Sequence, residues 1–297
     1  MSSIRVNPYI LPDLLAALDN TRQQADTASL ELSTGSRINK PSDDPAGAAQ
    51  LISNHDQSNQ ADSFLRSIGS ASGLIQTADS TLGSVVSVLQ RAISLGVEGA
   101  NGTLSAADRT DIATELTGIQ QQLVSLANTS YQGEFIFSGT STAQPFLADP
   151  TSPSGVTYTG TAGVNSIQAG QNYSLQINQP GSQVFSAPGA DVFQSVSDLI
   201  GALQSNSNIG SAVSELNNAF DHVTSQRVFY GNALNQLQSQ QNFLNSEKVD
   251  LGAAENSIAG ADPARTATTL AQAQIAISAE LAAMSRISQS SLFDYLK

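Results

Sequence analysis

The sequence predicts a mainly α-helical protein: a long antiparallel coiled-coil or helical-bundle rod, formed by the N- and C-terminal halves, with a small β-rich inserted domain. Apolar residues recur at alternating steps of three and four over residues 61–92 and again over 213–244. Such heptad stripes occupy one helix face and require partner helices along their length. Residues 131–190, between the two stripes, are instead rich in Gly, Pro, Ser and Thr.

The first predicted helix begins at Pro12 and ends before Gly35. Proline suits the first turn of a helix, and glycine commonly follows the last turn. Asp44 then caps a second helix that has Pro45 at its first position. The apolar stripe of the first helix comprises Leu14, Leu15, Leu18, Ala25, Ala28 and Leu32.

The second helix runs from Pro45 through the 61–92 stripe and ends near 96–102. Ser105 and Asp108 have the spacing of a capping box and open a third helix, whose apolar face extends to Leu126. A short turn separates the two helices, which predicts an antiparallel pair.

The inserted segment contains short alternating runs at Val156–Tyr158 and Tyr173–Ile177, which predict strands, and Pro180-Gly181, which predicts a turn. Helical periodicity returns at Asp191. We therefore expect three domains: 1–44 with 262–297 as the terminal helical coiled coil, 45–130 with 191–261 as a helical rod, and 131–190 as the β-rich middle domain.

The second long stripe, over 213–244, has Arg227 and Gln241 as polar interruptions. A single polar group in such a stripe usually fixes register. Arg227 either extends its head to solvent or forms a buried pair. Asp262-Pro263 repeats the cap-then-proline pattern and opens the last helix, whose apolar stripe comprises Leu270, Ala273, Ile277, Leu281, Met284 and Ile287.

Composition excludes several classes of function. The net charge of −13 argues against binding to nucleic acid or to an anionic membrane surface. The chain has no cysteine, so disulfides and thiolate metal sites are impossible. No apolar run is long enough to span a membrane. Pro8, Pro12 and Asp13 interrupt any apolar core of a cleaved signal peptide, so a secreted chain would use a route that needs none.

The sequence contains no recognisable catalytic, metal or cofactor site, and we expect no enzyme activity. His55 and His222 each lack a second histidine four residues away, and both fit solvent-exposed positions on helices. The segment Gly69–Gly73 resembles a nucleophile elbow, but Ala71 occupies the nucleophile position. It also lies inside a predicted helix rather than at a strand–turn–helix junction.

The segment Leu32–Ala49, which reads LSTGSRINKPSDDPAGAA, resembles the N-terminal signature of the bacterial flagellin superfamily. The segment from Asp262 to Leu296 is similar to the C-terminal helix of that superfamily. Within it, the segment 135–146 and the ending Ser291–Leu296 resemble the branch of hook-associated proteins found at the hook–filament junction.

This resemblance implies a structural subunit of the bacterial flagellum that forms a homo-oligomeric ring between hook and filament. Its partners would be other copies of itself, other hook-associated proteins, flagellin and a flagellar export chaperone. It would be extracellular and exported unfolded by the type III apparatus, without a cleaved signal peptide. The alternatives are a flagellin, the bulk filament subunit, and a secreted coiled-coil adhesin whose middle domain binds a ligand.

The resemblance also indicates which residues contact other subunits. Arg37, Asp43 and Asp44 are candidates for ion pairs within or between subunits. The subunit-interface residues expected on the terminal helices are Leu14, Leu18, Ala25, Leu32, Leu270, Ile277, Leu281, Met284, Leu292 and Leu296. The residues that match the superfamily's corner motif are Gly35, Arg37, Asn39, Asp43, Asp44, Pro45, Arg227 and Gly231.

The two terminal stripes are narrow and contain weak residues at several positions. Such a pair of helices is marginal alone, because helices gain most of their stability from packing. We therefore expect residues 1–32 and 262–297 to be loose in the monomer and to become ordered on assembly.

Overall fold

The computed structural model describes the backbone of residues 10–295 and the side chains of residues 12–286. The chain divides into two compact units. The terminal unit comprises residues up to Asn59 and from Glu247 onward, and the central unit comprises Gln60–Ser246. Helices α2 (Pro45–Gly99) and α6 (Ile209–Ala259) each contribute residues to both units.

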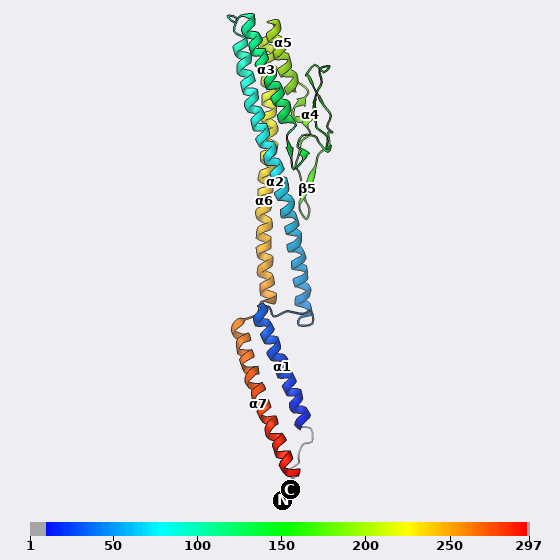
Figure 1. Ribbon diagram of the computed structural model, residues 1–297, viewed down its shortest axis with the longest axis vertical. Coiled ribbons are helices and arrows are strands. Elements are labelled where there is room, and N and C mark those ends of the chain that lie inside the picture. The colour runs from blue at the N-terminus through cyan, green and yellow to red at the C-terminus, as the bar shows by residue number, and fades with distance from the viewer. Residues whose placement is uncertain (1–9, 296–297) are drawn as a thin grey trace. The chain divides into compact units, whose positions relative to one another are not determined.

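The terminal unit contains α1 (Ile10–Thr34) and α7 (Pro263–Tyr295), which lie side by side (Figure 1). Thr21 contacts Glu280, and Thr266 contacts Glu31. Residues late in α1 therefore face residues early in α7, so the two helices are antiparallel.

The helix ends in this unit follow the predicted caps, with one shift. Gly35 has φ of +70°, which glycine adopts without strain, and it ends α1. Asp44 accepts the backbone N–H of Gly47 at 3.0 Å, at the start of α2. The predicted start of α1 at Pro12 is wrong by two residues, because the helix begins at Ile10. Proline is tolerated there, since a first-turn N–H has no partner within the helix.

The central unit is a bundle built from parts of α2 and α6 with α3 (Ala106–Ala127) and α5 (Val192–Ser205) (Figure 1). Ser105 and Asp108 form the predicted capping box of α3, and Asp191 caps α5. Most large apolar residues of the two heptad stripes are almost fully buried and form one core with α3 and α5, among them Ile68, Ile75, Leu82, Leu89, Leu216, Val223, Tyr230 and Leu237.

The strands of the described chain all lie within Ser130–Asp191 and form four separate antiparallel two-stranded pairs. The pairs are β1 (Ser130–Tyr131) with β2 (Glu134–Phe135), β3 (Phe146–Ala148) with β4 (Val156–Tyr158), β5 (Ser166–Gly170) with β6 (Tyr173–Gln176), and β7 (Ser186–Ala187) with β8 (Ala190–Asp191). The turn predicted at Pro180-Gly181 is wrong, because a short helix, α4 (Gly181–Val184), begins there.

Pairs of two strands cannot stabilise themselves, so this segment depends on side-chain packing. Its centre is a cluster of buried aromatic rings. Phe146 lies 5.5 Å from Phe185 and 5.2 Å from Phe193, between ring centroids. Phe137 meets Phe185 edge-on at 5.0 Å. Because Phe193 belongs to α5, the cluster attaches the strand segment to the helical bundle.

The fold is therefore mainly α, with long helices from both halves of the sequence and a small strand-containing insert. The three-domain division predicted from the sequence stays a prediction. The predicted boundary of the terminal domain lies in the segments between α1 and α2 and between α6 and α7, whereas the boundary between the two compact units lies within α2 and α6.

Candidate functional site

The first element of the candidate site is the seam between α1 and α7. Few side chains are buried on the described parts of these two helices, and most of them are small: Leu18, Ala28, Thr266 and Ala273. Polar contacts supplement them. The Thr21 hydroxyl donates to Glu280 Oε1 at 3.1 Å, and the Thr266 hydroxyl donates to Glu31 Oε2 at 3.3 Å. The seam therefore buries far less apolar area than the core of the central unit.

The predicted interface residues occupy different depths in this seam. Leu18 is buried, whereas Leu32 and Leu281 are 38% and 45% exposed. That these three residues, and the other predicted interface residues, contact another subunit stays a prediction. The half-buried residues are Leu14, Ala25, Leu270, Ile277 and Met284. The Leu292 side chain and all of Leu296 lie outside the described part of the chain.

Sequence reasoning missed Glu280 as a seam residue. Glu280 follows Ala273 by seven residues, which is the heptad signal, but a carboxylate is not expected in an apolar stripe. Its Oε1 accepts the Thr21 hydroxyl, while Oε2 is buried and lacks a hydrogen-bond partner among the described residues. A carboxylate inside a two-helix seam weakens an already thin contact.

The second element is a joint where the two connecting segments of the terminal unit cross. Ser36 and Gly260 form an antiparallel β-bridge. The Arg37 N–H donates to the Ala259 carbonyl at 2.6 Å, and the Ala261 N–H donates to the Gly35 carbonyl at 3.0 Å. The chain just after α1 is therefore hydrogen-bonded to the chain just before α7.

The Arg37 side chain connects three parts of this joint. Its Nη2 lies 3.0 Å from Asp44 Oδ2 and 2.9 Å from the Ile258 carbonyl oxygen. A cation beside the last carbonyls of α6 interacts favourably with the helix dipole. The N–H of Gly47 and then Arg37 hold the pKa of Asp44 below its ordinary value of 3.8. Asp44 thus joins the start of α2 to the end of α6 through Arg37.

Other corner-motif residues shape the loop around this joint. Asp43 Oδ2 accepts the backbone N–H groups of Asn39 and Lys40 at 3.0 and 2.8 Å. The Asn39 amide donates to the Ser36 carbonyl at 2.7 Å. Pro45 begins α2. Arg37 and Asp44 form an ion pair within the chain, whereas Asp43 stabilises the loop backbone.

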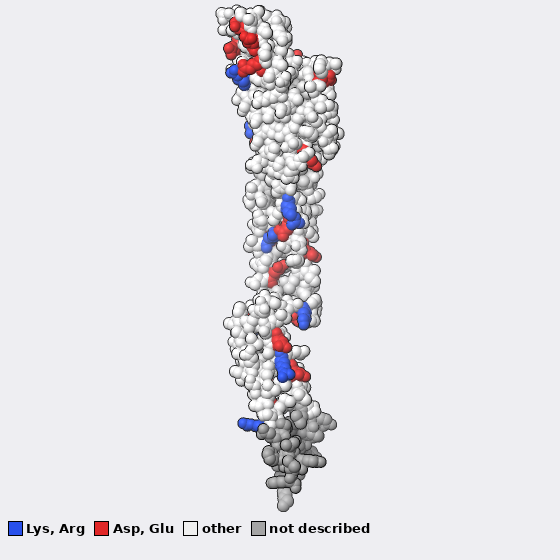
Figure 2. Space-filling view, viewed as in Figure 1, with Lys and Arg blue, Asp and Glu red and all other residues white. Residues whose placement is uncertain are grey.

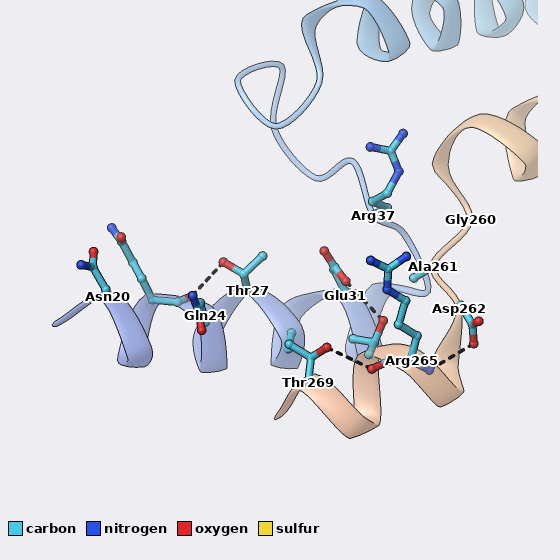
Figure 3. Close-up of a pocket in the computed structure, with 13 residues that line it drawn as sticks. Asn20, Gln24, Thr27, Glu31, Arg37, Gly260, Ala261, Asp262, Arg265 and Thr269 are labelled. Atoms are coloured by element: carbon cyan, nitrogen blue, oxygen red, sulfur yellow. Dashed lines mark hydrogen bonds between the residues drawn. The ribbon is translucent and has the colours of Figure 1, made fainter. Parts of the chain in front are cut away.

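A polar groove of about 760 Å³ lies beside the joint, between α1 and the start of α7 (Figure 3). Arg37, from the segment after α1, and Arg265, from the first turn of α7, line it together with Glu31 and Asp262 (Figure 3). Asp262 caps α7 by accepting the N–H groups of Ala264 and Arg265. The lining of the groove is mostly amide, hydroxyl and charged side chains, which suits contact with a polar protein surface.

Arg227, assigned to the corner motif by resemblance, lies in the central unit instead. Its Nε and Nη2 donate to Asp79 Oδ1 and Oδ2 at 3.1 and 3.2 Å, joining α6 to α2. The two side chains are 36% and 32% exposed, so the pair is partly buried. Gly231 follows on α6, with open space where a side chain would begin.

The described residues contain no group of three His, Asp or Glu side chains that could hold a metal ion. The expectation for His222 is wrong: its Nε2 lies 2.8 Å from the Gln183 carbonyl oxygen, and the residue is half-buried. His55 is exposed. By length and composition alone α2 could cross a membrane, but its Ile68, Ile75, Leu82 and Leu89 side chains are buried in the bundle. Figure 2 shows a face on which charged side chains are few and lie in small groups separated by uncharged surface.

Paired terminal helices, a crossing joint between their connecting segments and a strand-containing insert define a helical structural subunit. Residues 12–142 match the model of the bacterial flagellin N-terminal helical region, and residues 207–296 match that of the C-terminal helical region. Together the two matches cover well over half of the sequence. The chain belongs to the bacterial flagellin family.

Within that family the chain is similar to both junction and filament proteins. It is 38% identical over 130 residues to flagellar hook-associated protein 3 of Salmonella typhimurium, a match that covers 42% of this chain and 41% of that protein. The chain therefore matches less than half of that relative's length. It is 26% identical over 271 residues to a flagellin of Listeria monocytogenes, covering 88% of each chain.

A solved structure shows the same fold. The flagellar junction protein FlgL from Legionella pneumophila superposes with a TM-score of 0.61 and 16% sequence identity. The superposition covers 71% of this chain and 100% of that one.

Proposed function

We propose that this chain is a structural subunit of the bacterial flagellum that forms a ring joining the hook to the filament. The observation that carries the proposal is the α1–α7 pair: two long helices whose mutual seam buries few apolar side chains and leaves several exposed. We take the exposed apolar side chains of this helix pair as support for contact with another protein surface. The similarity to a hook-associated protein favours the junction as the place of that contact.

The proposed partners are other copies of this chain, other hook-associated proteins, flagellin and an export chaperone. The proposed location is outside the cell, after type III export without a cleaved signal peptide. Terminal helices that are loose before assembly suit passage of an unfolded chain. The proposed role is mechanical and needs no cofactor or catalysis.

The second candidate is a flagellin, the bulk filament subunit. The observation in its favour is the match to the Listeria flagellin across most of both chains. The identity of 38% over 130 residues of the hook-associated protein, against 26% over 271 residues of the flagellin, supports the junction assignment.

Deletion of the gene separates the two candidates. The junction role predicts hooks without filaments, with flagellin released into the medium. Loss of the filament subunit would also leave hooks without filaments, but the major flagellar protein would then be missing from the medium. Normal filaments after deletion would refute both. Complementation with the full chain is the positive control.

A further inference from the structure

The outer face of α1 carries a second stripe that the α1–α7 seam does not use. Its members follow steps of three and four along the helix and are all exposed: Asp19, Arg22, Asp26, Leu30 and Ser33. Residues at this spacing lie on one helix face. Leu30 is 42% exposed. Within the described residues, Asp19 has no salt bridge.

The outer face of α7 carries a stripe with a similar spacing. Its members are also all exposed: Gln272, Ile275, Ala279, Ala282 and Arg286. Ile275 is 71% exposed, as much as any other large apolar side chain among the described residues. Arg286 has no salt bridge in the part of the chain that the structure describes.

The two stripes match when one is read against the other in opposite directions. Asp19 precedes Leu30 by eleven residues, and Ile275 precedes Arg286 by eleven residues. An antiparallel alignment that places Leu30 against Ile275 therefore places Asp19 against Arg286. Between these two pairs Asp26 lies opposite Ala279, whose small side chain brings no opposing charge or bulk. One register thus joins both the apolar pair and the opposite charges.

We infer that the outer stripe of α1 in one copy packs antiparallel against the outer stripe of α7 in the next copy. This inference rests on the proposed function and specifies the contact between copies. The inner faces of α1 and α7 are occupied within each chain, so each copy offers one outer α1 face and one outer α7 face. Contacts between two different faces repeat head to tail, as a ring or a helical assembly requires.

Disulfide cross-linking tests this register, because the natural chain has no cysteine. Full-length Leu30→Cys and Ile275→Cys chains are produced together in cells that lack the natural gene. Flagella are sheared off, oxidised mildly and separated without reductant. The expected result is a cross-linked species at twice the 30.8 kDa chain mass, detected by immunoblot. Neither variant produced alone should give it.

The matched control pairs Leu30→Cys with Gln274→Cys. Gln274 is exposed and lies at nearly the same level of α7 as Ile275, but about 100° around the helix. It should not cross-link. A dimer formed by Leu30→Cys alone would indicate contact between identical faces and overturn the inference. Cross-linking of Leu15→Cys with Ile275→Cys in place of the expected pair would show another register and also overturn it.

A charge exchange provides a second test that needs no cysteine variant. Asp19→Arg and Arg286→Asp should each leave a fraction of hooks without filaments, because like charges would face each other between copies. The double variant should recover the filaments lost in either single variant. Single variants with the full complement of filaments would overturn the pairing. If gene deletion removes filaments but neither test succeeds, the inference fails while the junction function stands; normal filaments after deletion would reject the function itself.

Discussion

Two glycines in the same helix, Gly69 and Gly96, should respond in opposite directions to replacement by alanine. Gly69 has open space where a Cβ would lie. A Cβ at Gly96 would lie 2.7 Å from Val213 Cγ2 and 3.0 Å from Leu199 Cδ2. Because real Cβ atoms do not approach other atoms so closely, α5 or α6 must shift to accommodate Gly96→Ala.

The magnitudes follow from two effects. Alanine is favoured over glycine inside a helix by about 0.8–1 kcal/mol, so Gly69→Ala should stabilise the central unit by roughly that amount. Gly96→Ala gains the same preference but adds overpacking that costs about 1–3 kcal/mol. We expect the free energy of unfolding of the two variants to differ by roughly 1–3 kcal/mol, with Gly96→Ala the less stable.

Urea unfolding of the full-length variants, followed by circular dichroism, measures this difference. Equal stabilisation by both variants would show that α5 and α6 do not pack against α2 at the level of Gly96. Destabilisation by Gly69→Ala would show that its face of α2 is covered. Either outcome would refute the bundle geometry.

Three further experiments test caps, charge and burial in the central unit. Ser105→Ala removes the capping box of α3 and should lower the free energy of unfolding by about 1 kcal/mol, measured by urea unfolding. Burial raises the pKa of Asp191 above its ordinary value of 3.8. The contribution of Asp191 to stability therefore falls as the pH rises from 3.8 through the raised pKa. The free energy of unfolding of Asp191→Asn, measured in urea, should therefore rise relative to that of the natural chain as the pH increases above about 4, and a constant difference would contradict this. A double-mutant cycle with Asp79→Ala and Arg227→Ala should give a coupling of about 0.5–1 kcal/mol, because the pair is partly exposed; a coupling of zero would show that it does not join α2 to α6.

The features predicted correctly from the sequence are those encoded by neighbouring residues. The heptad stripe through Leu82 and the capping box at Ser105 depend on spacing along a single helix, and both are present. The glycine that ends α1 and the caps before Pro45 and Pro263 are equally local.

The features that sequence reasoning missed depend on segments far apart in the chain. The bridge between Ser36 and Gly260 requires two connectors that no local pattern relates. Glu280 occupies a heptad position, but its charge concealed its place in the seam. The half-buried position of His222 is not predictable from the sequence, because its partner is the backbone carbonyl of Gln183, which no sequence pattern reveals.

The central claim is that the two terminal helices need other copies of the chain to complete their packing. Amide hydrogen exchange of the full-length chain tests it most directly, in the purified monomer and in isolated hook–filament structures. The account predicts that amides in 12–32 and 263–286 exchange much faster than those of the central bundle in the monomer and become protected on assembly. Equal protection of terminal and central helices in the monomer would contradict it.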